Sequence, residues 1–263
     1  MRTVSLTLLV GGLCALLAAP AVEARCSHDS VLVGPVCVDK YEASVWSILA
    51  ANTKLIAKVK LGIATLANLT VGLATQVAPA LTCSASDYPL TFPNTGNWTA
   101  PLYAASIAGV LPSACLTWFQ AEQACRRSGK RLLTNQAWSG AAAGTPDPGG
   151  GGDGVTTCNT STSGPVNTGS TGDCVSNWGA RDMVGNVWEW VADWVPPGSG
   201  LCGTALFGSG DFNNLAGTTQ AAGTAALLRG GSRGSGTGAG VFDVRGDFSP
   251  SDVDDTIGFR CAR

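Results

Sequence analysis

The chain has 263 residues, of which only 13% are charged, and its formal net charge is −2. A charge this sparse and balanced, with no basic run, does not attract nucleic acid or an anionic membrane, so we expect no nucleic-acid partner. The length is sufficient to bury one sizeable core, and we expect a single domain.

Residues 1–24 have the features of a secretory signal peptide. Arg2 precedes the apolar run Val4–Ala19, and the small residues Val22 and Ala24 occupy positions minus three and minus one before the expected cleavage. The apolar run is too short for a lasting membrane span. We therefore expect residues 25–263 to be exported without a membrane span, as a secreted, periplasmic or cell-surface domain.

Ten cysteines occur, and nine remain once Cys14 leaves with the signal peptide. Cysteines of an exported chain are expected to form disulfides, and an odd number leaves at least one free or paired between chains. Two pairs bracket turn-rich stretches and are candidates for local disulfides: Cys26 with Cys37, and Cys158 with Cys174. The sole histidine, His28, argues against zinc binding and against a His-based catalytic triad.

In the first half of the chain, the alternating β-branched residues of Val31–Ser44 predict a strand that runs into a turn. The apolar spacing over Ser47–Leu73 predicts one or two amphipathic helices, which three lysines exclude from spanning a membrane. Pro79–Pro112 is rich in Pro, Asn, Ser and Thr and predicts an ordered insertion or long loop.

Two helices and three short strands are predicted further along the chain. Thr117 is a candidate N-cap of a helix that ends before Gly129, and Thr134 is a candidate N-cap of a second, shorter helix. Gly144–Asp173 is a low-complexity loop without a phosphate-binding pattern. The final third is glycine-rich, with strand-like pieces AALLRGGS, GVFDVRG and TIGFRCAR.

The run DMVGNVWEWVADW, residues 182–194, admits two interpretations. Asp182 and Glu189 offer carboxylate oxygens, and a bend at Gly185 can direct backbone carbonyls between them, as in a calcium site. Alternatively, the three tryptophans of this run are core residues and Glu189 is a buried acid among them, which requires a hydrogen-bond partner.

Five sequence blocks occur in the order of the formylglycine-generating enzyme, or sulfatase-modifying factor, family, and the chain resembles that family. The blocks are DKYEAS (Asp39–Ser44), TWFQAEQACRRSGKRLLTNQAW (Thr117–Trp138), GARDMVGNVWEW (Gly179–Trp190), RGGS (Arg229–Ser232) and GFRCAR (Gly258–Arg263). They leave about 45–114 as an insertion. The resemblance implies an irregular α+β domain related to C-type lectins, with little regular secondary structure and bound calcium.

The resemblance also implies site residues. The family calcium would be held by the side chains of Asp182 and Glu189 and the carbonyls of Gly185 and Val187. Enzyme members oxidise a protein cysteine to formylglycine with two copper-binding cysteines after the GGS motif. The corresponding positions here are Ser235 and Gly240. Copper(I) selects soft sulfur ligands, so we expect no copper and no catalytic residues at these positions.

The segment Arg233–Thr256 lies between the intact RGGS and GFR motifs, and we name it the recognition segment. Its layout resembles the variable region of the target proteins of diversity-generating retroelements, which display changeable ligand-contact residues on this fold. A simple solvated, glycine-rich loop is the alternative. The residues expected to line a recognition face are Arg233, Ser235, Asp243, Arg245, Asp247, Phe248, Asp252, Asp254 and Asp255.

These features favour an exported, non-catalytic domain that binds a protein, peptide or glycan through the face that is the active site in the enzymes. One alternative is a formylglycine-generating oxidase or another oxidoreductase acting on protein cysteine, since fold does not set function. A further alternative is a variable ligand-display protein of a diversity-generating retroelement, and a purely structural surface role is the last.

Overall fold

The computed structural model describes residues 26–84, 88, 100–147, 157–196, 213–214 and 224–263. The helices are α1 (Thr53–Lys60), α2 (Leu66–Val71), α3 (Trp118–Arg127) and α4 (Asn135–Ala142). The strands are β1 (Ser30–Val33), β2 (Val36–Asp39), β3 (Ala43–Ser47), β4 (Thr75–Val77), β5 (Leu102–Ser106), β6 (Arg131–Leu132), β7 (Trp188–Val195), β8 (Asn213–Asn214), β9 (Ala225–Arg229), β10 (Val244–Phe248), β11 (Ile257–Phe259) and β12 (Cys261–Ala262).

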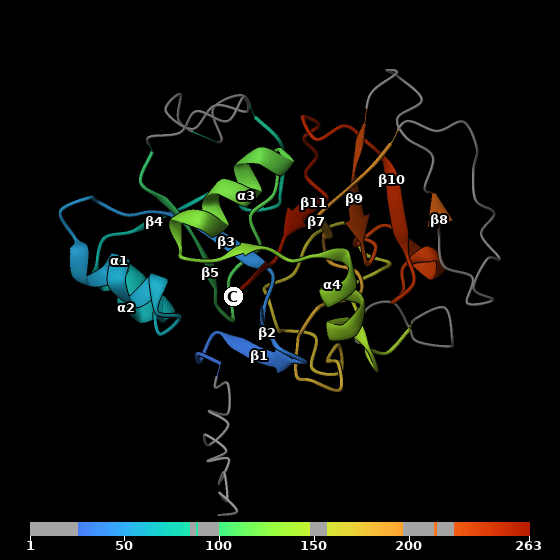
Figure 1. Cartoon of the computed structure of the whole chain (residues 1–263), viewed down its shortest axis with the longest axis horizontal. Helices are drawn as coiled ribbons and strands as arrows, with labels where there is room; N and C mark the ends of the chain where they lie inside the picture. The colour runs from blue at the N-terminus through green and yellow to red at the C-terminus, as the bar shows by residue number, and fades with distance from the viewer. Residues whose placement is uncertain (1–25, 85–87, 89–99, 148–156, 197–212, 215–223) are drawn as a thin grey trace, which may run out of the picture.

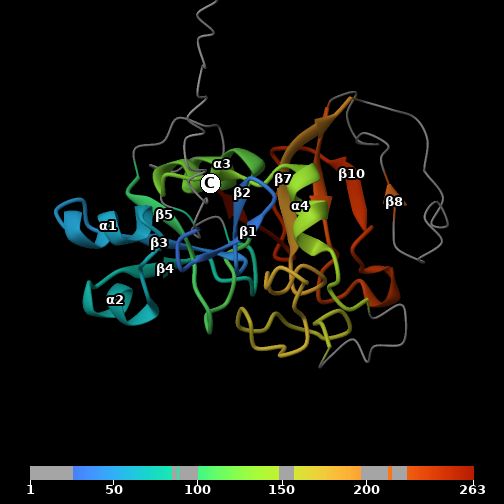
Figure 2. The ribbon, with the colours of Figure 1, turned by 60° about the horizontal axis from the view of Figure 1, so that its bottom comes forward.

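The strands form three sheets, in the orders β1-β2-β12-β6, β11-β7-β9-β10-β8 and β4-β3-β5. Strand β12, at the C-terminus, lies between β2 and β6, so both ends of the described chain meet in one sheet. Helices α1 and α2 lie at one end of the molecule beside β4, whereas β8 and β10 lie at the other end (Figures 1 and 2). Short strands, few helices and long connections confirm the expected irregular α+β class.

The N-terminal strand prediction was wrong in one respect. Residues 31–39 form an antiparallel hairpin rather than one strand, with Val33 opposite Val36. The chain reverses at Gly34, whose φ of 57° is in the left-handed region that glycine adopts readily. Alternation of apolar residues persists across such a tight turn, so the pattern alone did not show it.

The helix predictions are confirmed. The Thr117 hydroxyl accepts a hydrogen bond from the Gln120 amide while the Gln120 side chain accepts one from the Thr117 amide, which forms a capping box. Thr134 caps α4 through the Ala137 amide. Within the described residues, no helix is long and apolar enough to cross a membrane.

Four disulfides connect the eight cysteines in the described residues. Cys26–Cys37 and Cys158–Cys174 are the two predicted local pairs, and both are confirmed. The other two are Cys83–Cys115 and Cys125–Cys261, which joins residues 136 positions apart. Cys202 lies outside the described residues. The long-range bond fixes α3 to β12 within the main core cluster, beside the fully buried side chains of Trp190 and Phe259.

Strand pairing shows how the predicted insertion joins the core. Strand β3 pairs antiparallel with β5, and Ser47 lies opposite Leu102. The chain therefore leaves and re-enters the core at neighbouring positions, with α1, α2 and β4 in between. All five residues of β5 are buried, so this strand, although inside the predicted 45–114 insertion, is part of the core.

A buried charge network supports the N-terminal hairpin. The Lys130 ammonium lies 2.6 Å from a carboxylate oxygen of Asp29 and 2.6 Å from one of Asp39. Burial raises the pKa of Asp39 to about 6 although Lys130 opposes that shift. Burial by itself would also raise the pKa of Asp29, but Lys130 and Arg263 together lower it. Two carboxylates thus share one ammonium, and the charged form is stabilised more at Asp29 than at Asp39.

This network predicts a pH dependence of stability. Between pH 3.8 and about 6, folded Asp39 keeps a proton that the unfolded chain has released, so the free energy of unfolding falls as pH rises through this window. For the wild type, we expect the free energy of unfolding to fall by on the order of 3 kcal/mol across this window because of Asp39. Asp39→Asn should lack this fall. Urea unfolding at a series of pH values measures both. The control is Asp173→Asn, an exposed carboxylate. Parallel curves for wild type and Asp39→Asn would contradict the assignment.

Candidate functional site

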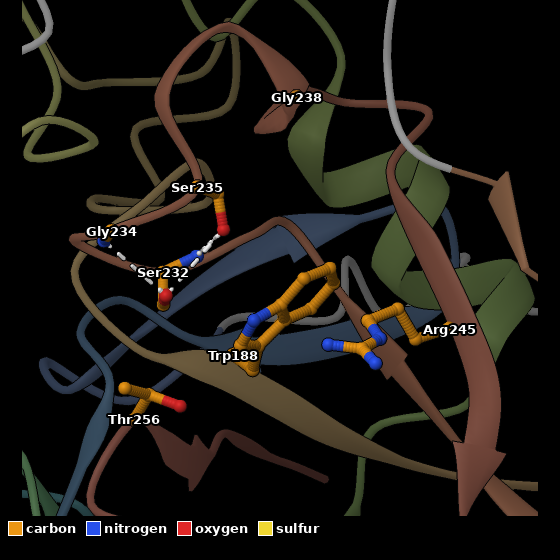
Figure 3. Close-up of a pocket in the computed structure, with 7 residues that line it drawn as sticks. All are labelled: Trp188, Ser232, Gly234, Ser235, Gly238, Arg245 and Thr256. Atoms are coloured by element: carbon orange, nitrogen blue, oxygen red, sulfur yellow. Dashed lines mark hydrogen bonds between the residues drawn. The ribbon is translucent and has the colours of Figure 1, made fainter. Parts of the chain in front are cut away.

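A pocket of about 470 Å³ opens where β7, the turn after β9, β10 and the residue before β11 converge. Its lining residues are Trp188, Ser232, Gly234, Ser235, Gly238, Arg245 and Thr256 (Figure 3). The wall thus combines one indole ring, one guanidinium and three hydroxyl groups. Such a mixture of an aromatic surface with a few polar groups is typical of ligand-binding sites.

Two glycines of the RGGS motif shape the turn that enters the pocket. Gly230 and Gly231 have φ values of 88° and 84°. A Cβ atom at Gly230 would lie 2.6 Å from the Met183 carbonyl oxygen, and one at Gly231 would lie 2.5 Å from the Ala239 Cβ. Both positions therefore need glycine for conformation and for space, and the motif is a structural requirement of the pocket.

The hydroxyl of Ser235 closes the next turn. It accepts a hydrogen bond of 2.9 Å from the Ser232 amide, and the Ser235 amide donates to the Ser232 carbonyl at 3.0 Å. The following amide, of Gly236, donates to the Thr160 carbonyl at 2.7 Å. This turn is held by its own backbone and hydroxyl groups and by the loop of Thr160.

Arg245 forms the opposite wall. Its guanidinium carbon lies 5.7 Å from the centre of the Trp188 ring and 4.5 Å from that of Phe248. It is also paired with the Asp247 carboxylate, with a closest approach of 2.6 Å. The side chain points toward Trp188 across the pocket in Figure 3. Stacking and the ion pair hold a partly exposed cation in a defined orientation.

The family model of the sulfatase-modifying factor enzyme 1-like domain matches residues 93–263 of this chain. The chain belongs to this family. Among proteins with curated descriptions, none matches the chain significantly. The family model begins after α1 and α2, so these two helices lie outside the part of the chain that matches it.

Several solved structures are similar to this chain at low sequence identity. The P3c variant of the Major Tropism Determinant is 18% identical, with a TM-score of 0.47, and the match covers 89% of this chain and 52% of that one, about half of its length. Variable protein 1 of Treponema denticola is 20% identical, with a TM-score of 0.41 over 57% of this chain and 70% of that one. CarF is 18% identical, with a TM-score of 0.40 over 87% and 85%.

The two positions that the resemblance assigns to the family's cysteines differ in their surroundings. Ser235 lines the pocket, whereas Gly240 is buried. Ala239, between them, packs in a buried cluster with the Cys158–Cys174 disulfide. All cysteines in the described residues form disulfides, so this part of the chain presents no thiolate to the pocket.

The structure brings two of the nine predicted recognition residues, Ser235 and Arg245, into the pocket wall. Asp247 and Phe248 contact Arg245, the first through an ion pair and the second through its ring. Asp243 is fully buried and lies against Gly231, so it is not on this face. Sequence reasoning misses the pocket role of Trp188, because this residue is only 6% exposed and also belongs to the main core cluster, as one of the two interpretations expects.

The remaining predicted recognition residues form internal contacts. Arg233 is 7% exposed and donates to the carboxylate of Asp255 at 2.8 Å and to its carbonyl at 3.0 Å. Asp254 accepts from the Thr256 amide, and Asp252 from the Ser249 amide. The acidic run therefore orders the turn that carries Thr256 to the pocket, and Asp252 is exposed at its outer edge.

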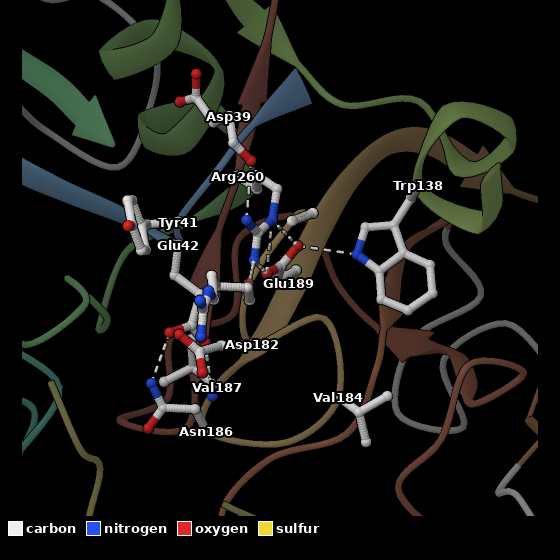
Figure 4. Close-up of polar contacts among 12 residues, drawn as sticks. Asp39, Tyr41, Glu42, Trp138, Asp182, Val184, Asn186, Val187, Glu189 and Arg260 are labelled. Atoms are coloured by element: carbon white, nitrogen blue, oxygen red, sulfur yellow. Dashed lines mark hydrogen bonds and ion pairs between the residues drawn. The ribbon is translucent and has the colours of Figure 1, made fainter. Parts of the chain in front are cut away.

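The predicted calcium loop is built around an arginine (Figure 4). Both carboxylate oxygens of Glu189 accept hydrogen bonds from Arg260, the shortest at 2.7 Å, and one also accepts from the Trp138 indole at 2.8 Å. The Asp182 carboxylate accepts from the Gly169 amide at 2.6 Å and from the Thr171 hydroxyl at 2.8 Å. Burial raises the pKa of Asp182, and these two hydrogen bonds oppose the shift.

A third carboxylate, Glu42 of the DKYEAS block, lies in the same cluster. It accepts from the Asn186 side chain at 2.6 Å and from the Val187 amide at 3.1 Å. Burial, and then the charges of Asp182 and Glu189, raise its pKa well above the ordinary value. Burial by itself would lower the pKa of Arg260, but Glu189 and the other two acids raise it. The positive charge of Arg260 therefore acts on three buried carboxylates, and Glu189 is its hydrogen-bonded partner.

The predicted calcium site consists of two side chains and two backbone carbonyls. The two side chains expected as ligands, Asp182 and Glu189, are engaged by hydrogen-bond donors, and Arg260 already supplies the positive charge that a cation would bring. No His, Cys, Asp or Glu group within the described residues has the grouping of a metal site. Calcium at this loop stays a prediction.

Glu189→Gln separates the two interpretations. If Arg260 is the partner of Glu189, the substitution leaves a buried guanidinium without its counter-charge, and we expect a loss of about 3 kcal/mol in the free energy of unfolding. Urea unfolding with calcium and with a chelator checks this, and the loss should be equal in both. A loss that appears only with calcium present would instead identify Glu189 as a calcium ligand. Arg126→Gln, which removes an exposed ion pair, is the control.

Proposed function

We propose that this chain is a non-catalytic member of its family that binds a protein, peptide or glycan through the pocket of Trp188 and Arg245. The observation that carries the proposal is the residue at position 235, where the resemblance expects a copper-binding cysteine. A serine hydroxyl there accepts a backbone hydrogen bond and completes the turn. The turn is thus closed by a hydroxyl at a position where the oxidation would require a soft sulfur ligand.

The chemistry of the wall supports ligand binding. Arg245 offers a charge-assisted hydrogen bond, Ser232 and Thr256 offer hydroxyl groups, and Trp188 offers a flat apolar surface. Arg and Trp are among the residues that contribute most to binding energy when they lie in a partly enclosed site. Arg245 is pre-oriented by Asp247, so little conformational entropy is lost when a ligand binds. Export from the cell, as expected from residues 1–24, would give the pocket access to extracytoplasmic ligands.

The catalytic alternative is tested by copper and aldehyde assays together. We expect the purified chain to show no tight copper(I) binding in a chelator competition, and no aldehyde on a peptide with a sulfatase-type cysteine. A variant with both Ser235→Cys and Gly240→Cys restores the two thiols and is the positive comparison for copper binding. Tight copper binding and turnover by the unaltered chain would overturn the proposal and point to Cys202, which is outside the described residues.

The binding function is tested with arrays of extracytoplasmic peptides and glycans. For any probe that binds, we expect Arg245→Gln to weaken affinity about 10- to 100-fold, because a charged hydrogen bond in a partly buried site is lost. Arg126→Gln, exposed on α3 and outside the pocket, should leave affinity unchanged. Equal affinities for wild type and Arg245→Gln across all binding probes would exclude this pocket as the site.

A further inference from the structure

Exposed apolar side chains are concentrated in the stretch of chain from the end of β3 to just past β4, which includes α1 and α2. Twelve large hydrophobic side chains in the described part of the chain are exposed, and seven of them lie between positions 49 and 81. We call this set the apolar end, and its members are Leu49, Leu61, Ile63, Leu66, Val71, Leu73 and Leu81. Where exposed apolar side chains lie together on a surface, that surface often contacts something outside the chain.

Packing within the domain does not require these side chains. Helix α1 buries Leu55 and Val59, and α2 buries Leu69. These three pack with Trp46 and Tyr103 of β3 and β5 in a separate core cluster. Each helix already has an inward-facing apolar side, so the members of the apolar end are additional to the core.

Leu73 is the clearest case. Its φ of 56° is in the left-handed region, and it follows the last turn of α2, where the Ala74 amide donates to the Leu69 carbonyl at 3.0 Å. Glycine usually occupies this position because a Cβ atom is unfavourable there. The side chain is nonetheless 78% exposed, so burial within the chain contributes little to offset the strain.

The charge of this region is opposite in sign to that of the whole chain. Lys54, Lys58 and Lys60 of α1 are all exposed, and no Asp or Glu occurs from position 43 to position 86. The net charge of −2, which argued against attraction to an anionic membrane, conceals this local excess of three positive charges. The lysines therefore lie in a segment without any acid to neutralise them.

The composition distinguishes a lipid surface from a protein partner. Protein interfaces are enriched in aromatic residues, Met and Arg, and depleted in Lys. The apolar end has aliphatic side chains, five of them leucines, and the neighbouring helix α1 carries three exposed lysines; leucine and lysine are both among the residues typical of helices that lie in a membrane interface. We propose that the α1–α2 end docks on an anionic lipid surface, with the aliphatic side chains in the headgroup layer and the three lysines at lipid phosphates.

The placement of the two helices agrees with this role. In Figures 1 and 2 they lie at one end of the molecule, and β10, which carries Arg245 of the pocket wall, lies toward the other. They also lie outside the part matched by the family model, so they add to the common domain. A chain docked through α1 and α2 would keep its pocket away from the lipid. The proposal is independent of what the pocket binds.

The test is co-sedimentation of the chain without residues 1–24, which retains every described residue, with two kinds of vesicle. One kind is phosphatidylcholine alone, and the other is equal parts phosphatidylcholine and phosphatidylglycerol. We expect binding to the anionic vesicles that weakens as salt is raised. Replacing Lys54, Lys58 and Lys60 by Gln should weaken it about 100-fold, whereas replacing all three by Arg should preserve it.

Leu73→Gly separates a membrane role from a structural one. Glycine relieves the left-handed backbone, so the melting temperature should rise by about 2 to 4 °C. Loss of the leucine side chain should weaken vesicle binding about tenfold. Val253→Ser, an exposed apolar residue of the recognition segment, is the matched control and should leave vesicle binding unchanged.

Three results would overturn the proposal. They are absence of binding to the anionic vesicles, equal binding by the Lys→Gln and Lys→Arg variants, and concentration-dependent dimerisation in sedimentation velocity that Leu73→Gly abolishes. The last result would identify the apolar end as an interface between two copies of the chain.

Discussion

The buried ion pair between Arg260 and Glu189 is the interaction on which the rest of the structure depends. Besides Glu189, the guanidinium of Arg260 donates to the carbonyls of Asp39 and Arg181, and Glu189 also accepts from Trp138. One side chain near the C-terminus thus connects the N-terminal hairpin, the loop before β7, β7 itself and α4. Because an unpaired charge at this depth is strongly unfavourable, these segments are stable only together.

The strand that precedes Arg260 helps to set the geometry of the pocket. Arg260 follows β11, and β11 pairs in parallel with β7, placing Ile257 opposite Trp188. The Trp188 amide then donates to the Thr256 carbonyl at 2.8 Å, so one indole and one hydroxyl of the pocket are positioned by strand register. The glycine turn after β9 supplies a further side of the pocket, with Ser232 and Ser235. Two walls of the pocket therefore rest on a sheet, and a site on rigid elements loses less entropy when it binds a ligand.

The sequence predicted those features whose cause is local. Thr117 and Thr134 cap helices through residues three positions ahead, and Cys158–Cys174 closes a loop within 16 residues. Family resemblance then supplied the fold class. The Arg260–Glu189 pair and the recruitment of Trp188 to the pocket depend on contacts between distant segments, which neither periodicity nor composition encodes. The sequence leaves the acidic residues after Asp247 either on a recognition face or in a solvated loop, because an acid in a sequence gives no sign of the backbone amide or arginine that it will contact.

The frame of the pocket does not depend on a thiol at position 235 or 240, which is consistent with the proposed non-catalytic function. The glycines after β9 and the register of β7 with β11 determine the shape of the pocket. In the proposed function, the Ser235 hydroxyl stabilises the turn at the position where the resemblance expects a thiol. Since binding requires shape and a few oriented polar groups, and copper chemistry requires two soft ligands in fixed positions, the same frame supports binding with far fewer constraints on its residues.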